Sequence, residues 1–154
     1  MRIKILSISE RQPEWVQMAC ADYARRLPKH LAPIWIDLPL ARHREDRQRA
    51  KDDEAARLVA ALPKSAQVVA LDEHGSAWTS LELSAQLQRW QSSGKDIALL
   101  IGGPDGLSAP LLARAEQCWS LSRLTLPHAM VRVLLIEQLY RASSILAGHP
   151  YHRA

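Results

Sequence analysis

Aromatic side chains are scarce in this chain of 154 residues: it has no phenylalanine, and aromatic residues make up 5% of the sequence. The paired aromatic residues on which RNA-recognition sheets stack bases are therefore missing. Apolar runs are short, and none approaches the ~20 residues that a membrane-spanning helix requires. The first six residues carry two cations among interrupted apolar residues, which predicts a first strand and no secretory signal. We expect a cytoplasmic protein with no membrane partner.

Cysteine is almost as rare. Cys20 and Cys118 each lie in an apolar pattern typical of a buried helix or strand, so we expect two free, buried thiols and no disulfide. Neither has a metal-ligating neighbour at suitable spacing. His149 and His152 are three residues apart, but Pro150 lies between them and no third ligand is nearby. We therefore expect no metal site.

Positive charge is in excess, with a formal net charge of +4 at pH 7 and a pI near 9.4. The dense charge run over residues 42–54 sums to zero and is typical of a solvated loop and helix face. From Gly106 onward, five arginines face only two acidic residues, Glu116 and Glu137, which gives +3. A polyanionic partner is therefore plausible, and the carboxyl-terminal third is where it would bind.

Short runs rich in Val, Ile and Leu alternate with helical patterns. The predicted strands are Ile3–Ile8, Ile34–Leu38, Gln67–Leu71, Ile97–Ile101 and Cys118–Leu121. The predicted helices open near Pro13, Asp46, Thr79, Ser108 and Pro127. This alternation predicts one α/β domain over residues 1–154, with a parallel sheet covered by helices on both faces.

Glycine is also rare, with six residues, yet three of them fall within Gly102–Gly106. In an open α/β sheet, ligands bind beyond the carboxyl ends of strands, which here are Leu71–Gly75, Ile101–Gly106 and Ser122–Pro127. The glycines either let the backbone approach a ligand or merely make a tight turn. No Lys-Ser or Lys-Thr follows them, and Gly-x-Gly-x-x-Gly is absent. The segment favours a nucleoside without phosphates, such as S-adenosylmethionine.

The carboxyl-terminal third carries a family resemblance, through the segments IGGPDGLS (101–108), LSRLTLPH (121–128), VR (131–132), EQLYRA (137–142) and HPYH (149–152). Together they resemble the ribosomal RNA large subunit methyltransferase H family, small members of the SPOUT methyltransferases. The similarity extends over the whole chain, including Trp15–Val16 and Leu71–Asp72, although residues 40–65 match less clearly. Asp105 stands where we expect glutamate in relatives.

The resemblance implies a trefoil knot in the carboxyl-terminal region and a homodimer whose active sites are completed across the interface. It implies S-adenosyl-L-methionine as the cofactor, and methylation of N3 of a pseudouridine (position 1915, helix 69) of 23S ribosomal RNA in the large subunit or assembled ribosome. By motif match, the cofactor contacts are Leu71, Gly102, Gly103, Ser122, Arg123, Leu124, Thr125, Leu126 and Pro127.

N3 of a pseudouridine carries a proton that must leave, so we expect a base or a cation near it. The catalytic candidates are His128, Tyr151, His152 and Arg153. A histidine near its usual pKa accepts the proton, an arginine stabilises the developing anion, and a tyrosine stacks on the base or hydrogen-bonds to it. Arg132 is the expected RNA contact. Alternatively, His128 is an ordinary first-turn residue and the tail is frayed.

Two other functions remain open on the sequence. A non-enzymatic ribosome-binding or assembly factor would use the same basic surface without a cofactor. A small nucleotide-binding α/β protein would act on a metabolite. Cofactor binding and methyl labelling of ribosomal RNA distinguish these alternatives from a methyltransferase.

Overall fold

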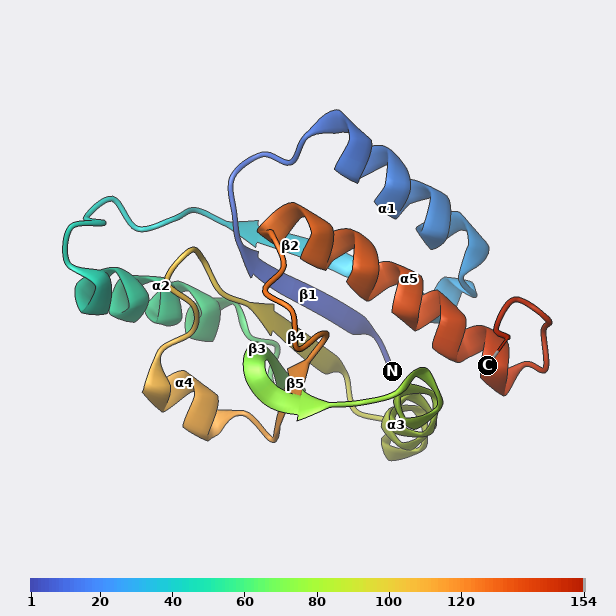
Figure 1. Cartoon of the computed structure of the whole chain (residues 1–154). Helices are drawn as coiled ribbons and strands as arrows, with labels where there is room; N and C mark the ends of the chain where they lie inside the picture. The colour runs from blue at the N-terminus through green and yellow to red at the C-terminus, as the bar shows by residue number, and fades with distance from the viewer. Residues whose placement is uncertain (154) are drawn as a thin grey trace.

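Five parallel strands form one sheet in the computed structural model, which describes residues 1–153 (Figure 1). They are β1 (Ile3–Ile8), β2 (Ile34–Leu38), β3 (Gln67–Ala77), β4 (Ile97–Ile101) and β5 (Gln117–Ser120). The strand order is β2-β1-β4-β3-β5, and every pairing is parallel. The predicted fold class is confirmed, and the carboxyl ends of all five strands lie at one edge.

Four α-helices connect the strands, namely α1 (Glu14–Arg26), α2 (Arg47–Ala61), α3 (Ser80–Ser93) and α4 (Ala109–Arg114), and α5 (His128–Leu146) follows β5. Two predicted caps are confirmed. The Thr79 hydroxyl accepts from the Glu82 N–H at 3.1 Å, and the Ser108 hydroxyl accepts from the Leu111 N–H at 3.4 Å. Gly94 ends α3 in the left-handed region, with a φ of 70°.

The strands alternate between two buried faces. On β4, Ile97, Leu99 and Ile101 face the cluster formed with α1, α3 and α5. Ala98 and Leu100 face the opposite cluster, which α2 and α4 cover. Figure 1 shows the two helical layers on either side of the sheet. Strands buried on both faces carry continuous apolar runs, which is why their positions were visible in the sequence.

Strand β3 is longer than predicted. It was expected to end at Leu71, where its pairing with β4 does end, but it continues to Ala77 beside β5. The register shifts between these two parts, because Trp119 of β5 pairs with Leu71 and again with Ser76. A Cβ on Gly75 would lie 2.7 Å from the Cys118 carbonyl carbon, so the strands touch closely there. Because the residues of this bulge are polar, the apolar pattern of the sequence did not predict the second half of the strand.

The two cysteines are free, as predicted, and lie on opposite faces of the sheet. Cys20 is buried, and burial raises the pKa of its thiol. Cys118 is only half-buried, so its expected full burial is wrong. Within residues 1–153, no helix is both long and apolar enough to cross a membrane. The trefoil knot implied by the resemblance stays a prediction.

Candidate active site

A cleft of about 1160 Å³ opens at the carboxyl edge of the sheet. Most of its lining comes from four segments, which are residues 8–13 after β1, 71–74 in the bulge of β3, 101–107 after β4, and 119–126 after β5. The first turn of α5 closes one side with His128, Ala129 and Val131. This is the edge at which the sequence predicted a ligand site.

Most of the predicted cofactor contacts line this cleft: Leu71, Gly102, Gly103, Ser122, Leu124, Thr125 and Leu126. Arg123 and Pro127 belong to the same loop but do not face the cleft. Local hydrogen bonds shape the loop, because the Ser122 hydroxyl accepts from the Leu124 N–H at 2.9 Å. The structure therefore gathers these residues in one place, and their contact with a cofactor stays a prediction.

The glycine turn, residues 102–106, is both tight and open to the cleft. The Gly106 N–H donates to the Gly103 carbonyl at 3.0 Å, and Gly106 has a φ of 81°. A Cβ on Gly102 would lie 2.7 Å from the Gly106 carbonyl carbon. Such a distance requires the backbone to move, so Gly102 is needed for the turn to close. The two interpretations of these glycines are therefore compatible: they make the turn, and the turn presents bare backbone to the cleft.

The sequence analysis missed the segment that follows β1, Ser9–Pro13, and it missed Lys51 of α2. A signal for the first was available, because a strand beside β4 ends at the same edge of a parallel sheet. The sequence prediction considered the carboxyl ends of three other strands and left out that of β1. Arg11 and Lys51 bring two cations to the rim of the cleft.

His128 lies at the start of α5, where it is half-buried, and its Nε2 is 3.3 Å from the Ser7 hydroxyl. Burial lowers the pKa of His128, and the nearby Arg132 guanidinium lowers it further, whereas Asp37 opposes the shift. The imidazole is therefore neutral at pH 7 and keeps one ring nitrogen as an acceptor. Because the ring also lines the cleft, it is available to take a proton there.

The tail, residues 149–153, folds back against the second half of α5. The Tyr151 hydroxyl donates to Glu137 at 2.9 Å, and its ring packs edge-on against Tyr140 at 4.6 Å. His152 Nδ1 lies 3.3 Å from an Arg141 nitrogen. Burial, followed by hydrogen bonds with Tyr23 and Glu137, raises the pKa of Tyr151, so this hydroxyl stays protonated and serves as a donor. The tail contacts argue against fraying.

One chain does not bring the tail to the cleft. His128 begins α5, whereas the tail leaves its other end and folds back along it (Figure 1). The Tyr151 hydroxyl bonds to Glu137, which is nine residues along the helix from His128, or about 14 Å at the usual rise. Tyr151, His152 and Arg153 are absent from the cleft lining. Of the four catalytic candidates, the structure places only His128 beside the predicted cofactor residues.

Residues 1–152 match the family model described as "Predicted SPOUT methyltransferase". The chain belongs to this family. A relative from Alkalilimnicola ehrlichii, named "Ribosomal RNA large subunit methyltransferase H", is 50% identical over 100% of both chains. A relative of the same name from Hahella chejuensis is 47% identical over 99% of each. These matches confirm the resemblance and the enzyme class.

One solved structure is similar in fold, a probable methylase family protein from Haemophilus influenzae. It has a TM-score of 0.52 and 12% sequence identity, and the match covers 99% of this chain and 70% of that one. At this identity the likeness concerns the fold alone.

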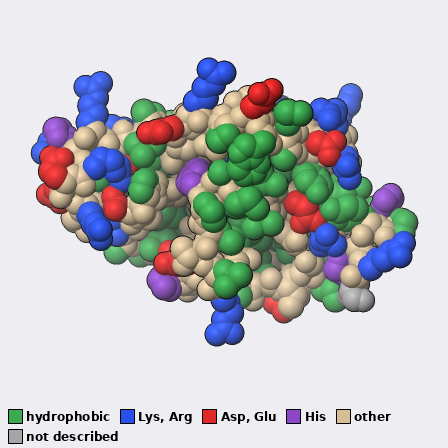
Figure 2. Space-filling view, turned by 45° about the horizontal axis from the view of Figure 1, so that its top comes forward, with side chains coloured by type: hydrophobic (Ala, Val, Ile, Leu, Met, Phe, Trp, Pro, Cys, Tyr) green, Lys and Arg blue, Asp and Glu red, His purple; other side chains and the backbone are tan. Residues whose placement is uncertain are grey.

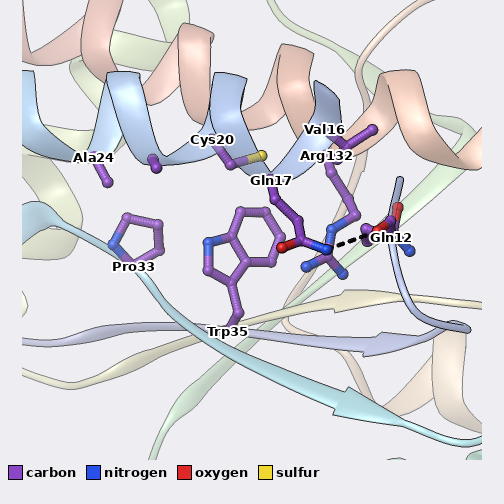
Figure 3. Close-up of a pocket in the computed structure, with 9 residues that line it drawn as sticks. Gln12, Val16, Gln17, Cys20, Ala24, Pro33, Trp35 and Arg132 are labelled. Atoms are coloured by element: carbon purple, nitrogen blue, oxygen red, sulfur yellow. Dashed lines mark hydrogen bonds between the residues drawn. The ribbon is translucent and has the colours of Figure 1, made fainter. Parts of the chain in front are cut away.

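In this SPOUT methyltransferase, Arg132 lies away from the cleft, in a groove of about 270 Å³ between α1 and β2 (Figure 3). It is buried, pairs with Asp37 at 2.7 Å, and places its guanidinium 4.2 Å from the Trp35 ring centre. These contacts favour a structural role. Its contact with RNA stays a prediction. Within the described part of the chain, no three side chains gather as a metal site needs.

The lowered pKa of His128 predicts a pH-dependent stability. Below its ordinary pKa of 6.5, the unfolded chain binds a proton that the folded protein does not, so stability falls as the pH drops from 7 to 5. We expect His128→Asn to lose less melting temperature over this range than the wild type, as followed by circular dichroism. His74→Asn is the matched control, because His74 is 83% exposed. If the melting temperatures of wild type and His128→Asn changed equally with pH, the lowered pKa of His128 would be contradicted.

Proposed function

We propose that this SPOUT methyltransferase uses S-adenosylmethionine to methylate N3 of a pseudouridine in 23S ribosomal RNA, in the cytoplasm where ribosomes are assembled. The observation that carries the proposal is the cleft, in which bare backbone of the glycine turn and the loop after β5 lies beside a neutral His128. The names of relatives up to 50% identical over the full chain support the same reaction.

The residues of the cleft fit this cofactor. Gly102 and Gly103 expose main-chain groups that would bind the adenine and ribose without a phosphate cradle, and Leu71, Leu124 and Leu126 would offer apolar surface to the purine. S-adenosylmethionine supplies an electrophilic methyl group on its sulfonium. The protein's own part is to hold the donor and the base in line and to exclude water.

The N3 proton needs an acceptor, and His128 has the right state for that role. It is neutral near pH 7, lies in the cleft, and is hydrogen-bonded to the buried Ser7, which fixes its ring. Arg153 is an exposed cation that would stabilise the imide anion once the tail reaches the base. Tyr151, held protonated, would donate a hydrogen bond or stack.

The position of the tail supports a homodimer with shared active sites. Large apolar side chains remain exposed on the helical face formed by α1 and α5, namely Trp15 at 51%, Met18 at 64% and Met130 at 36%. Figure 2 shows hydrophobic side chains gathered on this face. Exposed apolar patches of this kind mark interaction surfaces. A second copy covering this face antiparallel to the first would bring its tail to the cleft.

The substrate test compares ribosomal particles with free RNA. The described residues 1–153 form one α/β sheet with its helices, without a second fold for RNA. We therefore expect methylation of large subunits or ribosomes to exceed that of naked 23S RNA by at least about tenfold. The particles come from cells that lack this protein, and transfer is followed with a radioactive methyl group. Mass spectrometry of nuclease fragments then locates the product on N3 of a pseudouridine.

The outcomes separate the alternatives. Equal labelling of naked RNA and particles would contradict recognition through the ribosomal context. Ribosome binding without cofactor binding in calorimetry would favour an assembly factor. Labelling of a small molecule, with ribosomal RNA left unlabelled, would favour a metabolite enzyme.

A further inference from the structure

A buried carboxylate lies directly behind the glycine turn. Glu54 of α2 is 2% exposed, and its Oε2 accepts from the Ala41 N–H at 2.9 Å and from Arg44 Nη1 at 2.6 Å. Its Oε1 has no hydrogen-bond partner among the described residues. A buried carboxylate is costly without a charged partner, so Arg44 is what makes Glu54 tolerable at this position.

Arg44 also binds the turn itself. Its Nη2 donates to Asp105 Oδ2 at 2.5 Å, and Asp105 is only 18% exposed. One planar guanidinium therefore joins a carboxylate of α2 to a carboxylate of the glycine turn, an arrangement that suits arginine and not lysine. The hydrogen bond to Glu54, together with the two negative charges, raises the pKa of Arg44. Arg44 is thus charged at every working pH.

The same carboxylate packs under the turn. A Cβ on Gly103 would lie 2.9 Å from Glu54 Oε1 and 3.1 Å from Ile8 Cγ2. The Gly103 backbone therefore packs closely against the Glu54 carboxylate, with no room for a side chain. The turn is held from behind at two points, Gly103 against Glu54 and Asp105 by Arg44. Neither Glu54 nor Arg44 lines the cleft, so any effect on a ligand passes through the turn.

We propose that Arg44 and Glu54 are positioning residues that hold the glycine turn in its cofactor-binding conformation before the cofactor arrives. A turn whose closure depends on glycines is flexible on its own, and ordering it during binding would weaken affinity. The bridge removes that cost because the turn is already ordered. This inference rests on the proposed function for its ligand, and it assigns a role to the segment 40–65, which the family resemblance left without one.

The first test measures S-adenosylmethionine affinity by calorimetry for Arg44→Gln, Asp105→Asn and the double variant. We expect each single change to raise the Kd for the cofactor about tenfold. The double variant should bind the cofactor as tightly as the weaker-binding single variant does, because all three variants lose the same bridge. In turnover, KM for the cofactor rises while kcat at saturation is kept. Arg44→Lys restores only part of the affinity, since an ammonium does not span both acids.

The matched control is Arg47→Gln. Arg47 lies 3.7 Å from the same Asp105 carboxylate but is 84% exposed, so its loss should leave Kd within about twofold of wild type. Asp105→Asn controls for loss of stability, because it removes only the contact between Arg44 and the turn and leaves the buried Arg44–Glu54 pair intact. Unchanged Kd in Asp105→Asn, or a loss of affinity that follows melting temperature in all variants, would overturn the proposal.

A second measurement needs no ligand. Hydrogen exchange in the cofactor-free protein should become faster in residues 101–107 of Arg44→Gln and Asp105→Asn, and should stay unchanged in β1. If the wild type does not bind S-adenosylmethionine, the proposed function fails while this measurement still shows whether the bridge orders the turn. Equal exchange in wild type and variants would refute the role of the bridge independently.

Discussion

Replacing Gly102 with alanine is expected to lower S-adenosylmethionine affinity by at least about a hundredfold and to abolish methylation. The added Cβ would lie 2.7 Å from the Gly106 carbonyl carbon, 2.9 Å from its oxygen and 3.0 Å from the Leu107 nitrogen. All three are backbone atoms, so no side chain can rotate away. The turn must open, and the surface that it presents to the cleft changes with it. Calorimetry with the cofactor measures the loss directly.

Gly94→Ala is the control for this experiment. Gly94 has a φ of 70°, but a Cβ there meets no atom within 4 Å, and it ends α3 outside the cleft lining. Alanine should therefore cost about 1 kcal/mol of stability and leave cofactor affinity unchanged. A Gly102→Ala protein that melts like Gly94→Ala and still binds the cofactor as the wild type does would remove the glycine turn from the proposed site.

The sequence predicted those parts of the fold that depend on local pattern. Strands β1, β2 and β4 have the predicted bounds because buried parallel strands are continuous apolar runs. The second half of β3 escaped prediction because Asp72–Gly75 is polar and bulged. It belongs to the strand because Ser76 and Ala77 pair with Trp119 and Ser120 of β5. Local pattern does not report such a long-range contact.

The candidate site likewise contains residues that local pattern predicts and residues that depend on long-range contacts. Gly102 and the loop after β5 were found because strand ends and glycines are visible locally. Arg44 was not found, because its partner Asp105 is 61 positions away and nothing in a charge run distinguishes a bridging arginine from a solvated one. The distance between His128 and the tail was equally invisible, since it depends on the direction that α5 takes after leaving the cleft.

Two inactive variants should restore activity when they share a dimer. A variant ending at Pro150 lacks Tyr151, His152 and Arg153 but keeps the cleft, so it should bind S-adenosylmethionine and fail to methylate. Gly102→Ala loses the cleft but keeps Tyr151–Arg153. Because the proposed dimer completes each site with the partner's tail, a mixed dimer contains one intact cleft facing one intact tail. Random pairing makes half of the dimers mixed, so activity should return to about one quarter of the wild-type level.

Pairing in trans is favoured because the tail is bound to α5 outside the cleft of its own chain. The helix holds His128 in the cleft, and the tail is bound farther along it. Glu137, which accepts from the Tyr151 hydroxyl, is nine residues from His128, or about 14 Å at the usual rise, and Arg141 lies beside His152. A tail that acts within its own chain would have to break these contacts and extend farther along α5 to the cleft. In that case, mixing the two variants would restore no activity. Light scattering confirms that both variants still form dimers, and differential tags isolate the mixed species for assay. Full activity of the shortened variant alone would show that the tail takes no part in catalysis.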